Sequence, residues 1–559
     1  MAAASKARLT GLAHLLFRRL RTSVLLDCIR YLTNAAPWFA AALGIGAIGP
    51  TLAQFPPPRF DIVEFRVEGN TVLDVQLIER AVYAFMGEGR NVDDVENARA
   101  TLEAVYRQAG YGTVVVDTPE QRVVDGVITL QVREAPVSRL RVVGAKYFSQ
   151  DRIVAAVPGL AEGQVPNFKQ VSEQLGAVNN SADRRVTPLL RPGKTAGTTE
   201  VELSVEDKLP LHGSLELNNR QSPNTTATRL QGALRYDNLW QRQHSVGLQW
   251  QVSPENTSEV LVLSASYTVP LGRDLLVFSA LRSDSSVFAG VGDTNVLGKG
   301  SIVGLRYIRT LQGSDALFHT ATLGADHKDF RENVRTGLGT EAATGFSTPI
   351  RYLPLSANYA ATLTDASGRW QAGAGLVLAL RGLVSDEAQF EDKRFGGQGN
   401  FSLLKFDVSR TQQLPQGMTL FGRAEAQLAS QPLIGNEQFV AGGASSVRGY
   451  LEASAVGDNA LRGSLELRAP PVLAGLWGVV ESVQFQGFAD AALLRLKMPL
   501  PGQASHARLL GAGLGLTLRS VPVAGLAPVF TLEAAWPLRK LGSTEKGDTR
   551  LHASGAIEF

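Results

Sequence analysis

The stretch LRGSLELR, residues 461–468, alternates apolar and polar side chains with a period of two. Successive side chains of a strand point to opposite faces, so leucine and glycine form one face, and arginine, serine and glutamate form the other. The apolar face suits contact with lipid. The charged face would be costly in the dry core of a soluble sandwich, but it suits a water-filled lumen. The stretch therefore predicts a strand of a membrane β-barrel.

Similar strands fill the region from residue 209 to the end of the chain. The alternation recurs in HSVGLQWQV (244–252), SLLKFDVSR (402–410) and TLFGRAEAQL (419–428). About 350 residues are available, and a membrane strand takes ~9–11 residues besides its turns and loops. We therefore expect a membrane β-barrel of about 16 antiparallel strands, within a range of roughly 14 to 18, over residues 209–559. A large secreted β-sandwich or solenoid is the soluble alternative, and the aligned charges argue against it.

The last expected strand ends on an aromatic residue. Leu551, Ala553, Gly555, Ile557 and Phe559 share one face of it. A final strand that closes with an aromatic side chain resembles the signal that bacterial outer-membrane barrels present to their assembly machinery. We therefore expect Phe559 to be the C-terminal assembly signal.

The first 53 residues have the features of a targeting segment. Basic residues precede the apolar run APWFAAALGIGAIG (36–49), and TLA at 51–53 offers small residues for cleavage. We expect a signal peptide over 1–53 and a proline-rich, extended stub over 54–60. An uncleaved membrane anchor is the alternative, although the apolar run is short for a span and contains Pro37. The only cysteine, Cys28, lies in this segment.

Residues 61–208 contain an internal duplication. FRVEGN (65–70) matches LRVVGA (140–145) at an offset of 75 residues, and Ile78 aligns with Ile153 at the same offset. Each copy has a strand that ends at a glycine, then two helices, then two closing strands. We therefore expect two small α+β domains of the order β-α-α-β-β, over 61–136 and 137–208.

The first helix of the first copy indicates how these domains pack. Asp74 is the expected N-cap, and Val75, Ile78, Val82 and Phe85 follow on one helix face. A cofactor pocket could have such a lining, but packing of the helix on a small sheet is the simpler explanation. Domains of this kind leave sheet edges that can take up an extended polypeptide as an added strand.

An arginine stands outside the strand pattern in ASSVRGYLEASAVGDN (444–459). In SVQFQGFADAA (482–492), the period of two places Asp490 on the same face as Phe488 and the glutamines, which is the lumen side. A carboxylate in a narrow lumen favours a cation as its partner, and arginine can hold it through two parallel hydrogen bonds. We therefore predict that Arg448 latches an inward-folded loop to Asp490.

These features together resemble the two-partner secretion transporters, the TpsB family of haemolysin and filamentous-haemagglutinin exporters, whose repeated α+β domains are called POTRA domains. The family carries the motif V-R-G-Y at the tip of a loop that folds back into the lumen. This sequence has the motif as Val447, Arg448, Gly449 and Tyr450. The resemblance implies an inward-folded loop around residues 440–458 of this chain.

The family has a second motif, F-x-D-x-G, on an inward-facing strand. Phe488 and Asp490 match it, while Ala492 replaces the final glycine. The resemblance implies that Asp490 is the partner of the loop arginine. Gly449 would allow a tight turn at the loop tip, and Tyr450 would pack against the wall with its hydroxyl in water.

The resemblance also implies a function. The chain would be a pore in the outer membrane of a Gram-negative bacterium, with periplasmic POTRA domains, that secretes a large exoprotein of the haemolysin, adhesin or contact-dependent toxin type. Its partners would be this exoprotein, the barrel-assembly machinery and outer-membrane lipid. No nucleic-acid partner is expected, because 55 basic residues nearly balance 52 acidic ones.

Two alternatives stay open. A barrel-assembly insertase of the same superfamily shares the loop motif, but usually carries three or more POTRA domains. A passive porin would have no use for such domains. The stub leaves no room for the plug helix that some family members carry, so we expect none. No H-E-x-x-H or G-x-S-x-G motif is present and the seven histidines are scattered, so we predict no catalytic residue, no metal site and no cofactor.

Overall fold

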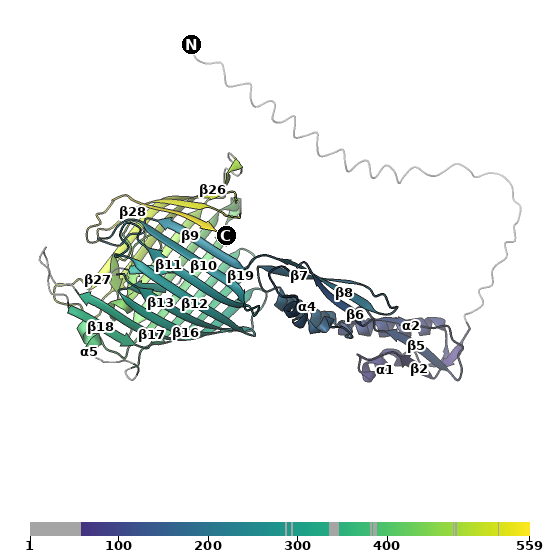
Figure 1. The fold of residues 1–559 in the computed structure, drawn as a ribbon. Coiled ribbons are helices and arrows are strands. Elements are labelled where there is room, and N and C mark those ends of the chain that lie inside the picture. Colours follow the sequence, from purple (N-terminus) through teal and green to yellow (C-terminus); the bar gives the residue numbers. More distant parts are fainter. Residues whose placement is uncertain are drawn as a thin grey trace, which may run out of the picture.

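The computed structural model describes residues 58–559 except 286–287, 292–293, 335–345, 381–382, 384–387, 473–474, 476–477 and 524. Two small α+β units lead into a large closed barrel (Figure 1). The expected signal peptide, most of the expected stub and any plug helix before residue 58 lie outside the described residues. No described helix is both long enough and apolar enough to cross a membrane.

The barrel is one closed sheet of antiparallel strands. β18 (Phe346–Tyr352) and β19 (Leu355–Asp365) lie in line and both pair with β17 (Leu317–Val334), because Pro354 between them cannot donate to the ladder. They share one strand position, so the barrel has 16 positions, and the expected fold class is confirmed. The other barrel strands are β9 (Leu211–Asn218), β10 (Arg229–Leu239), β11 (His244–Val252), β12 (Leu261–Leu271), β13 (Asp274–Ser283), β16 (Gly300–Thr310), β20 (Gly368–Leu378), β21 (Ser402–Gln413), β22 (Thr419–Ala429), β25 (Asn459–Arg468), β26 (Val480–Arg495), β27 (His506–Ser520), β28 (Val529–Pro537) and β29 (Arg550–Glu558).

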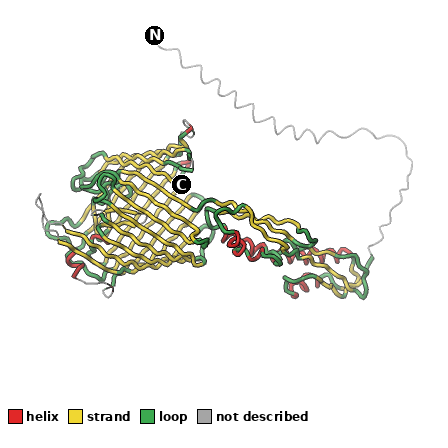
Figure 2. Tube along the Cα trace, in the orientation of Figure 1, coloured by secondary structure: helices red, strands yellow, loops and turns green. Residues whose placement is uncertain are grey.

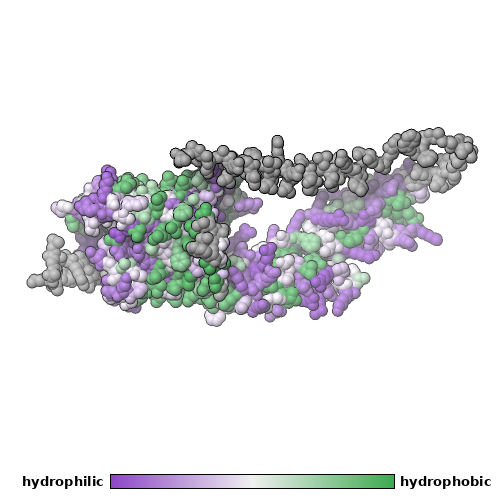
Figure 3. Space-filling model, turned by 90° about the horizontal axis from the view of Figure 1, so that it is seen from above, coloured by the Kyte–Doolittle hydropathy of each residue, from purple (hydrophilic) through white to green (hydrophobic). Residues whose placement is uncertain are grey.

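The period of two separates the faces of the barrel wall as the sequence predicts. In β25, Leu461 and Leu465 are each 53% exposed on the outer face, whereas Arg462 and Glu466 are buried inside. Figure 3 shows hydrophobic side chains gathered over the barrel wall and hydrophilic side chains at its end and on the α+β units. The outer wall therefore suits lipid, and the polar side chains line the lumen.

Loops and short elements gather at the barrel end away from the α+β units (Figure 2). They include a hairpin between β13 and β16 and a short helix before β21. A small hairpin between β22 and β25 reaches further in and packs against β26 and β27. These elements are β14 (Phe288–Val291), β15 (Thr294–Leu297), α5 (Ala388–Lys393), η4 (Gly435–Glu437), β23 (Phe439–Ala441) and β24 (Ala455–Gly457), and η3 (Pro415–Gly417) forms a turn at the opposite end.

The two α+β units repeat one topology. The first has β1 (Phe60–Ile62), β2 (Glu64–Glu68), α1 (Val75–Tyr83), β3 (Gly87–Arg90), α2 (Val92–Ala109), β4 (Val115–Asp117) and β5 (Val127–Arg133). The second has β6 (Val137–Val143), α3 (Gln150–Ala155), η1 (Pro158–Leu160), α4 (Phe168–Val178), β7 (Arg184–Pro192) and β8 (Thr199–Asp207). The sheet orders β2-β5-β4 and β6-β8-β7 are equivalent.

The glycines that end the duplicated strands have the same structural reason. Gly69 and Gly144 both have a φ of +86°. A Cβ added at either position would lie 2.4 Å from a backbone oxygen, that of Val132 or Val205 respectively. One expectation for the first helix was wrong: Val75 is 61% exposed, because it opens α1 before the turn that packs on the sheet. The pairing of β1 with β3 was not foreseen.

The two units are joined where the end of α2 meets the start of α4. The carbonyls of Gln108–Gly110 at the end of α2 accept hydrogen bonds from Lys169 Nζ (2.6 Å), Asn167 Nδ2 (3.0 Å) and Phe168 N (2.8 Å) at the start of α4. Such carbonyls lack partners within their own helix. The contact therefore fixes the second unit against the first through backbone groups that need a donor.

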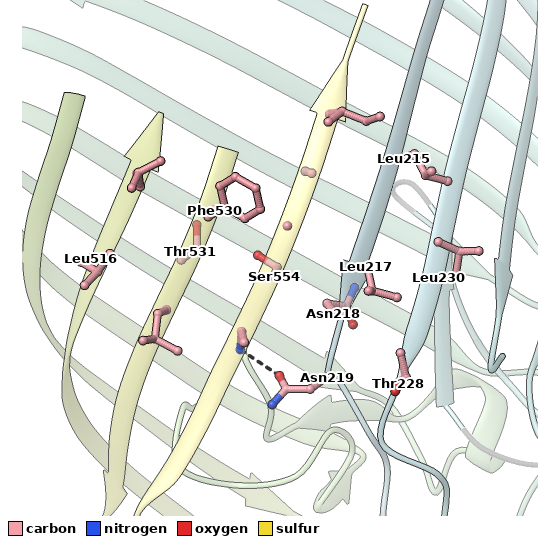
Figure 4. A pocket seen from close by; sticks show the side chains of 16 residues that line it. Leu215, Leu217, Asn218, Asn219, Thr228, Leu230, Leu516, Phe530, Thr531 and Ser554 are labelled. Carbon is pink, nitrogen blue, oxygen red and sulfur yellow. Dashed lines mark hydrogen bonds between the residues drawn. The ribbon is translucent and has the colours of Figure 1, made fainter. Parts of the chain in front are cut away.

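The barrel closes where its last strand meets its first. β29 pairs with β9 only over Ser554–Glu558. Beyond this short ladder, the side chain of Asn219 continues the seam. Its Oδ1 accepts from Ala553 N at 2.9 Å (Figure 4), and its Nδ2 donates to Leu551 O at 2.8 Å. The amide of Asn219 thus extends the closing seam by two hydrogen bonds.

The outer face of this seam is apolar, and the small side chains of β29 leave a shallow groove in it. Leucines of β9 and β27 and Phe530 surround a groove over the small side chains of β29 (Figure 4). At the other end of the seam, Phe559 exchanges two backbone hydrogen bonds with Gly213. A Cβ at Gly213 would lie 2.2 Å from the ring of Phe559, so glycine is needed there for the ring to lie across β9.

We expect Asn219→Ala to weaken the closing seam. Each of the two lost hydrogen bonds contributes about 0.5–1.5 kcal/mol. Samples are heated to increasing temperatures and then run on a gel that keeps the folded barrel intact. The temperature at which the folded band is replaced by the unfolded band should therefore be lower for Asn219→Ala. Gln249→Ala is the matched control, because its strand is paired along its length on both sides. Equal conversion temperatures for the two variants would contradict this role of Asn219.

Candidate functional site: an ion-paired loop in the barrel lumen

The segment between β22 and β25, residues 430–458, folds into the barrel, and we call it the inward loop. Its small hairpin, β23 with β24, carries the motif at its tip. Val447 and Tyr450 are fully buried in a cluster with Ala492, Leu494 and Leu509 of the wall. The tip is therefore packed against β26 and β27 and is not a free surface turn.

The structure brings Arg448 and Asp490 into direct contact. The Nε of Arg448 donates to Asp490 Oδ2 at 2.7 Å, and its Nη2 donates to Oδ1 at 3.0 Å. The backbone N–H of Arg448 adds a third bond to Oδ2 at 3.1 Å. Arg448 is 6% exposed and Asp490 is 1% exposed. The pair is thus bidentate and nearly free of water, which is the stronger form of such an interaction.

Two further carboxylates complete the surroundings of the guanidinium. Nη1 of Arg448 donates to Glu533 Oε1 of β28 at 2.9 Å and to Glu466 Oε2 of β25 at 3.1 Å. Arg468 donates to the other oxygen of Glu466 at 2.6 Å. Neither Glu533 nor Glu466 was expected to contact the loop. The available signal was the phase of each strand, since both carboxylates lie on the lumen face.

Phe488 contributes through its ring. The guanidinium carbon of Arg448 lies 3.4 Å from the centre of the Phe488 ring, which is a stacked cation–π contact. Burial opposes the charge of Arg448, but the hydrogen bonds and charges of Asp490 and Glu533 outweigh it and raise the pKa of the guanidinium. Arg448 is therefore a permanent cation held on one face by an aromatic ring and at its edges by carboxylates.

The rest of the motif shapes the tip. Gly449 has a φ of +97°, and a Cβ there would lie 2.8 Å from the backbone nitrogen of Pro537, so the turn needs glycine. The hydroxyl of Tyr450 was expected to stay in water, and this was wrong. It donates to the backbone oxygen of Arg539 (2.7 Å) and accepts from the backbone N–H of Leu510 (3.3 Å), because the ring reaches through the lumen to β27 and the loop after β28.

The replacement of glycine by Ala492 in the strand motif leaves the pair intact. Ala492 is 1% exposed, and its methyl group belongs to the cluster under the tip. The close approach of the loop is made instead at Gly511 of β27, where a Cβ would lie 2.1 Å from the backbone oxygen of Arg448. Gly511 is a position that the motif alone does not indicate.

One group of side chains has the spacing of metal ligands. Asp183 of the second unit and His212 and Asp237 of the barrel offer ligand atoms within 4.8 Å of one another. Lys208 Nζ lies 3.5 Å from Asp183, and Arg235 Nε lies 3.1 Å from Asp237. Cations of the chain thus already face both carboxylates. We interpret the group as an ion-paired joint, to which Gln241 adds hydrogen bonds with Ser149 N and Tyr147 O.

A closed barrel with a charged lumen, an ion-paired inward loop and preceding α+β units defines a class, the outer-membrane translocation pores with POTRA domains. The chain belongs to the haemolysin secretion/activation protein ShlB/FhaC/HecB family, whose model matches residues 197–518. The model of the ShlB-type POTRA domain matches residues 60–135. The resemblance to two-partner secretion transporters is therefore confirmed, and the chain is an outer-membrane protein with periplasmic POTRA domains.

Similar proteins agree with this assignment. The outer membrane transporter CdiB of Dickeya dadantii (strain 3937) is 24% identical over 499 residues, which cover 83% of this chain and 81% of that protein. The structure of CdiB from Escherichia coli matches with a TM-score of 0.57 and 21% identity, over 92% of this chain and 93% of that one. BamA from Haemophilus ducreyi lacking POTRA domains 1–3 matches with a TM-score of 0.54 and 14% identity, over 89% and 100%. The two structural matches show a shared fold.

We expect Arg448→Ala to free the loop tip. The change leaves three lumen carboxylates without the guanidinium, and removing one partner of a buried ion pair costs on the order of 3–5 kcal/mol. A spin label at Ser445→Cys, in a Cys28→Ser background, should become more mobile. Arg448→Lys keeps the charge but loses the fork, so its label should show intermediate mobility.

Arg410→Ala is the matched control for this experiment. It removes an arginine that pairs with Asp365 at 2.6 Å and whose other partners are Ser367, Gln412 and Trp370. Its spin-label spectrum should equal that of the parent protein. An immobile label in Arg448→Ala would show that the ion pair does not hold the tip.

Proposed function

We propose that the inward loop is the gate of this two-partner secretion transporter and that Arg448 with Asp490 is its latch. The observation that carries the proposal is the set of bonds made by the guanidinium of Arg448. The guanidinium belongs to the tip of the loop, and it bonds to three carboxylates of the barrel wall. A loop held by side-chain contacts can leave the lumen without any change in the barrel wall.

The strength of the attraction between Arg448 and Asp490 depends on how well water is excluded from the pair. Two unit charges at 4 Å attract each other by about 4 kcal/mol at an effective dielectric constant of 20, and by about 1 kcal/mol in bulk water. Entry of water with a partner chain would therefore weaken the Arg448–Asp490 pair. The proposal explains how a tight latch can open without a source of energy in the transporter itself.

We further propose that the periplasmic domains take up the partner in extended form. β7 of the second domain pairs with β8 on one side only among the described strands, and β4 of the first domain is an edge in the same way. Leu189 on β7 is 44% exposed and Val115 on β4 is 47% exposed. An added strand would gain backbone hydrogen bonds along the edge and apolar contacts at alternate positions.

The partner is proposed to be one large exoprotein, captured by its N-terminal region. No nucleotide-binding motif has been found, so folding of the emerging chain outside the cell would supply the driving force. Phe559 as the signal for the barrel-assembly machinery also remains a proposal. Its ring is 49% exposed at the end of the last strand, where a recognition protein could reach it.

A barrel-assembly insertase is the second candidate function, and the fold likeness to BamA favours it. Deletion of the gene separates the two. We expect the loss of one large protein from the medium or cell surface, with other outer-membrane barrels unchanged, measured by quantitative proteomics of both fractions. A general decrease of outer-membrane barrels would support the insertase and contradict export.

A porin is the third candidate, and channel recordings distinguish it from a latched transporter. In planar bilayers we expect the parent protein to be mostly closed and Asp490→Asn to open more often, because Asn cannot pair with Arg448 as a charge. Complementation of the deletion strain with Asp490→Asn should change secretion of the partner. Steady conductance of the parent protein, unaltered by Asp490→Asn, would contradict the gate.

A further inference from the structure

One buried carboxylate of the inward loop, Glu437, contacts strands of the barrel wall other than those that hold Arg448. Glu437 lies in η4, at the start of the loop, and is 6% exposed. Its Oε1 accepts from Lys328 Nζ of β17 at 2.5 Å and from the hydroxyl of Tyr352 of β18 at 2.6 Å. Its backbone oxygen also accepts from Gln427 Nε2 at 3.2 Å.

Glu437 and Arg448 contact parts of the barrel wall that are well separated. In the strand order of the barrel, β20, β21, β22 and β25 lie between β18 and β26 on one side, and β29, β9–β13 and β16 lie between β28 and β17 on the other. The inward loop therefore crosses the lumen, with η4 against β17 and β18 and its tip against β26 and β27. A cavity of about 520 Å³ beside the loop is lined by residues of β21, β22 and the loop.

The site of Glu437 is built for a charge. Burial disfavours the carboxylate, but Lys328 and Lys405 outweigh burial and lower the pKa of Glu437. Lys328 also lies 5.6 Å from the centre of the Tyr352 ring. A buried carboxylate between a lysine and a tyrosine hydroxyl loses its partners whenever the loop moves.

Tyr352 is itself fixed by aromatic packing in the outer half of the barrel. Its ring lies 5.5 Å from that of Phe390 in α5 and 6.4 Å from that of Phe401, in edge-to-face geometry. Leu433 and Ile434, which precede η4, belong to the same buried cluster. The start of the loop thus has a rigid acceptor site, to which α5 of another loop contributes.

We propose that Glu437, with Lys328 and Tyr352, is a second anchor of the inward loop, independent of the Arg448 latch. The inference rests on the proposed function of the loop as a gate. Glu437, Lys328 and Tyr352 are positioning residues: they keep the loop across the lumen after the tip has been released. The pore opens fully only when the contacts of Arg448 and those of Glu437 are both broken.

The test measures conductance in planar bilayers for Glu437→Gln, Arg448→Ala and the double variant, all as full-length protein. With two anchors, each single change leaves the loop attached at one wall. We expect the double variant to raise the ratio of open to closed time by roughly tenfold or more over Arg448→Ala, the size expected for losing a hydrogen-bonded charge. Asp284→Asn is the matched control, since its ion pair with Lys299 lies in another loop.

A milder variant tests the same anchor with less risk that the protein fails to fold. Tyr352→Phe removes one hydrogen bond to Glu437 and keeps the ring packing, so Tyr352→Phe with Arg448→Ala should lie between Arg448→Ala and the double variant. If the double variant behaves like Arg448→Ala, the second anchor is wrong while the proposed gate stands. If Arg448→Ala and the double variant both behave like the parent protein, the proposed gate and the second anchor are both wrong.

Discussion

The constraint on which this structure depends is that the lipid interior offers no hydrogen-bond partner to a polypeptide backbone. Each N–H and C=O of a membrane-embedded strand must therefore bond to a neighbouring strand, and the sheet must close on itself. The closure explains why the shortest ladder, between β29 and β9, is extended by the amide of Asn219 and by the backbone of Phe559. It also explains the alternation along the strands, because every strand of a closed barrel has one face in lipid and one in the lumen.

Closure also produces a lumen that is lined by charged side chains. Asp490, Glu466 and Glu533 project from β26, β25 and β28 into a narrow space, where unpaired carboxylates would repel one another and lack water. The guanidinium of Arg448 bonds to all three. A single loop residue thereby neutralises part of the wall. In the proposed gate, the interaction that pairs these buried charges is also the one that would break during translocation.

The joints between the parts of the chain differ in their chemistry. The two POTRA domains meet through backbone carbonyls at the end of α2, which have few other partners. The second domain meets the barrel through an ion-paired group in which Asp183 is buried and His212 is half-buried, and through the hydrogen bonds of Gln241. The first joint therefore uses backbone groups at a helix end, and the second uses side-chain charges and an amide.

Much of this architecture follows from local pattern. The period of two assigns each strand residue to lipid or lumen, so the barrel, the side of Asp490 and the charge pairing with Arg448 could be inferred without coordinates. The duplication at an offset of 75 residues gave both α+β domains, and the equivalent glycines at Gly69 and Gly144 give its physical reason. The burial of residues at the ends of helices was harder to predict. Val75 has the spacing of a core residue but is exposed, because the pattern does not tell where a helix leaves the sheet.

Contacts between distant strands were decided only by the tertiary structure. A period of two gives the face of a side chain but not its height in the barrel, and height depends on the register of every ladder between the two strands. For this reason Glu533, Gly511, and the pairing of Glu437 with Lys328 and Tyr352 could not be derived from the sequence. The burial of the Tyr450 hydroxyl has the same origin, since its hydrogen-bond partners at Leu510 and Arg539 reach the tip only when the barrel is closed. The sequence by itself determined which residues face the lumen, and closure of the barrel determined which of them meet.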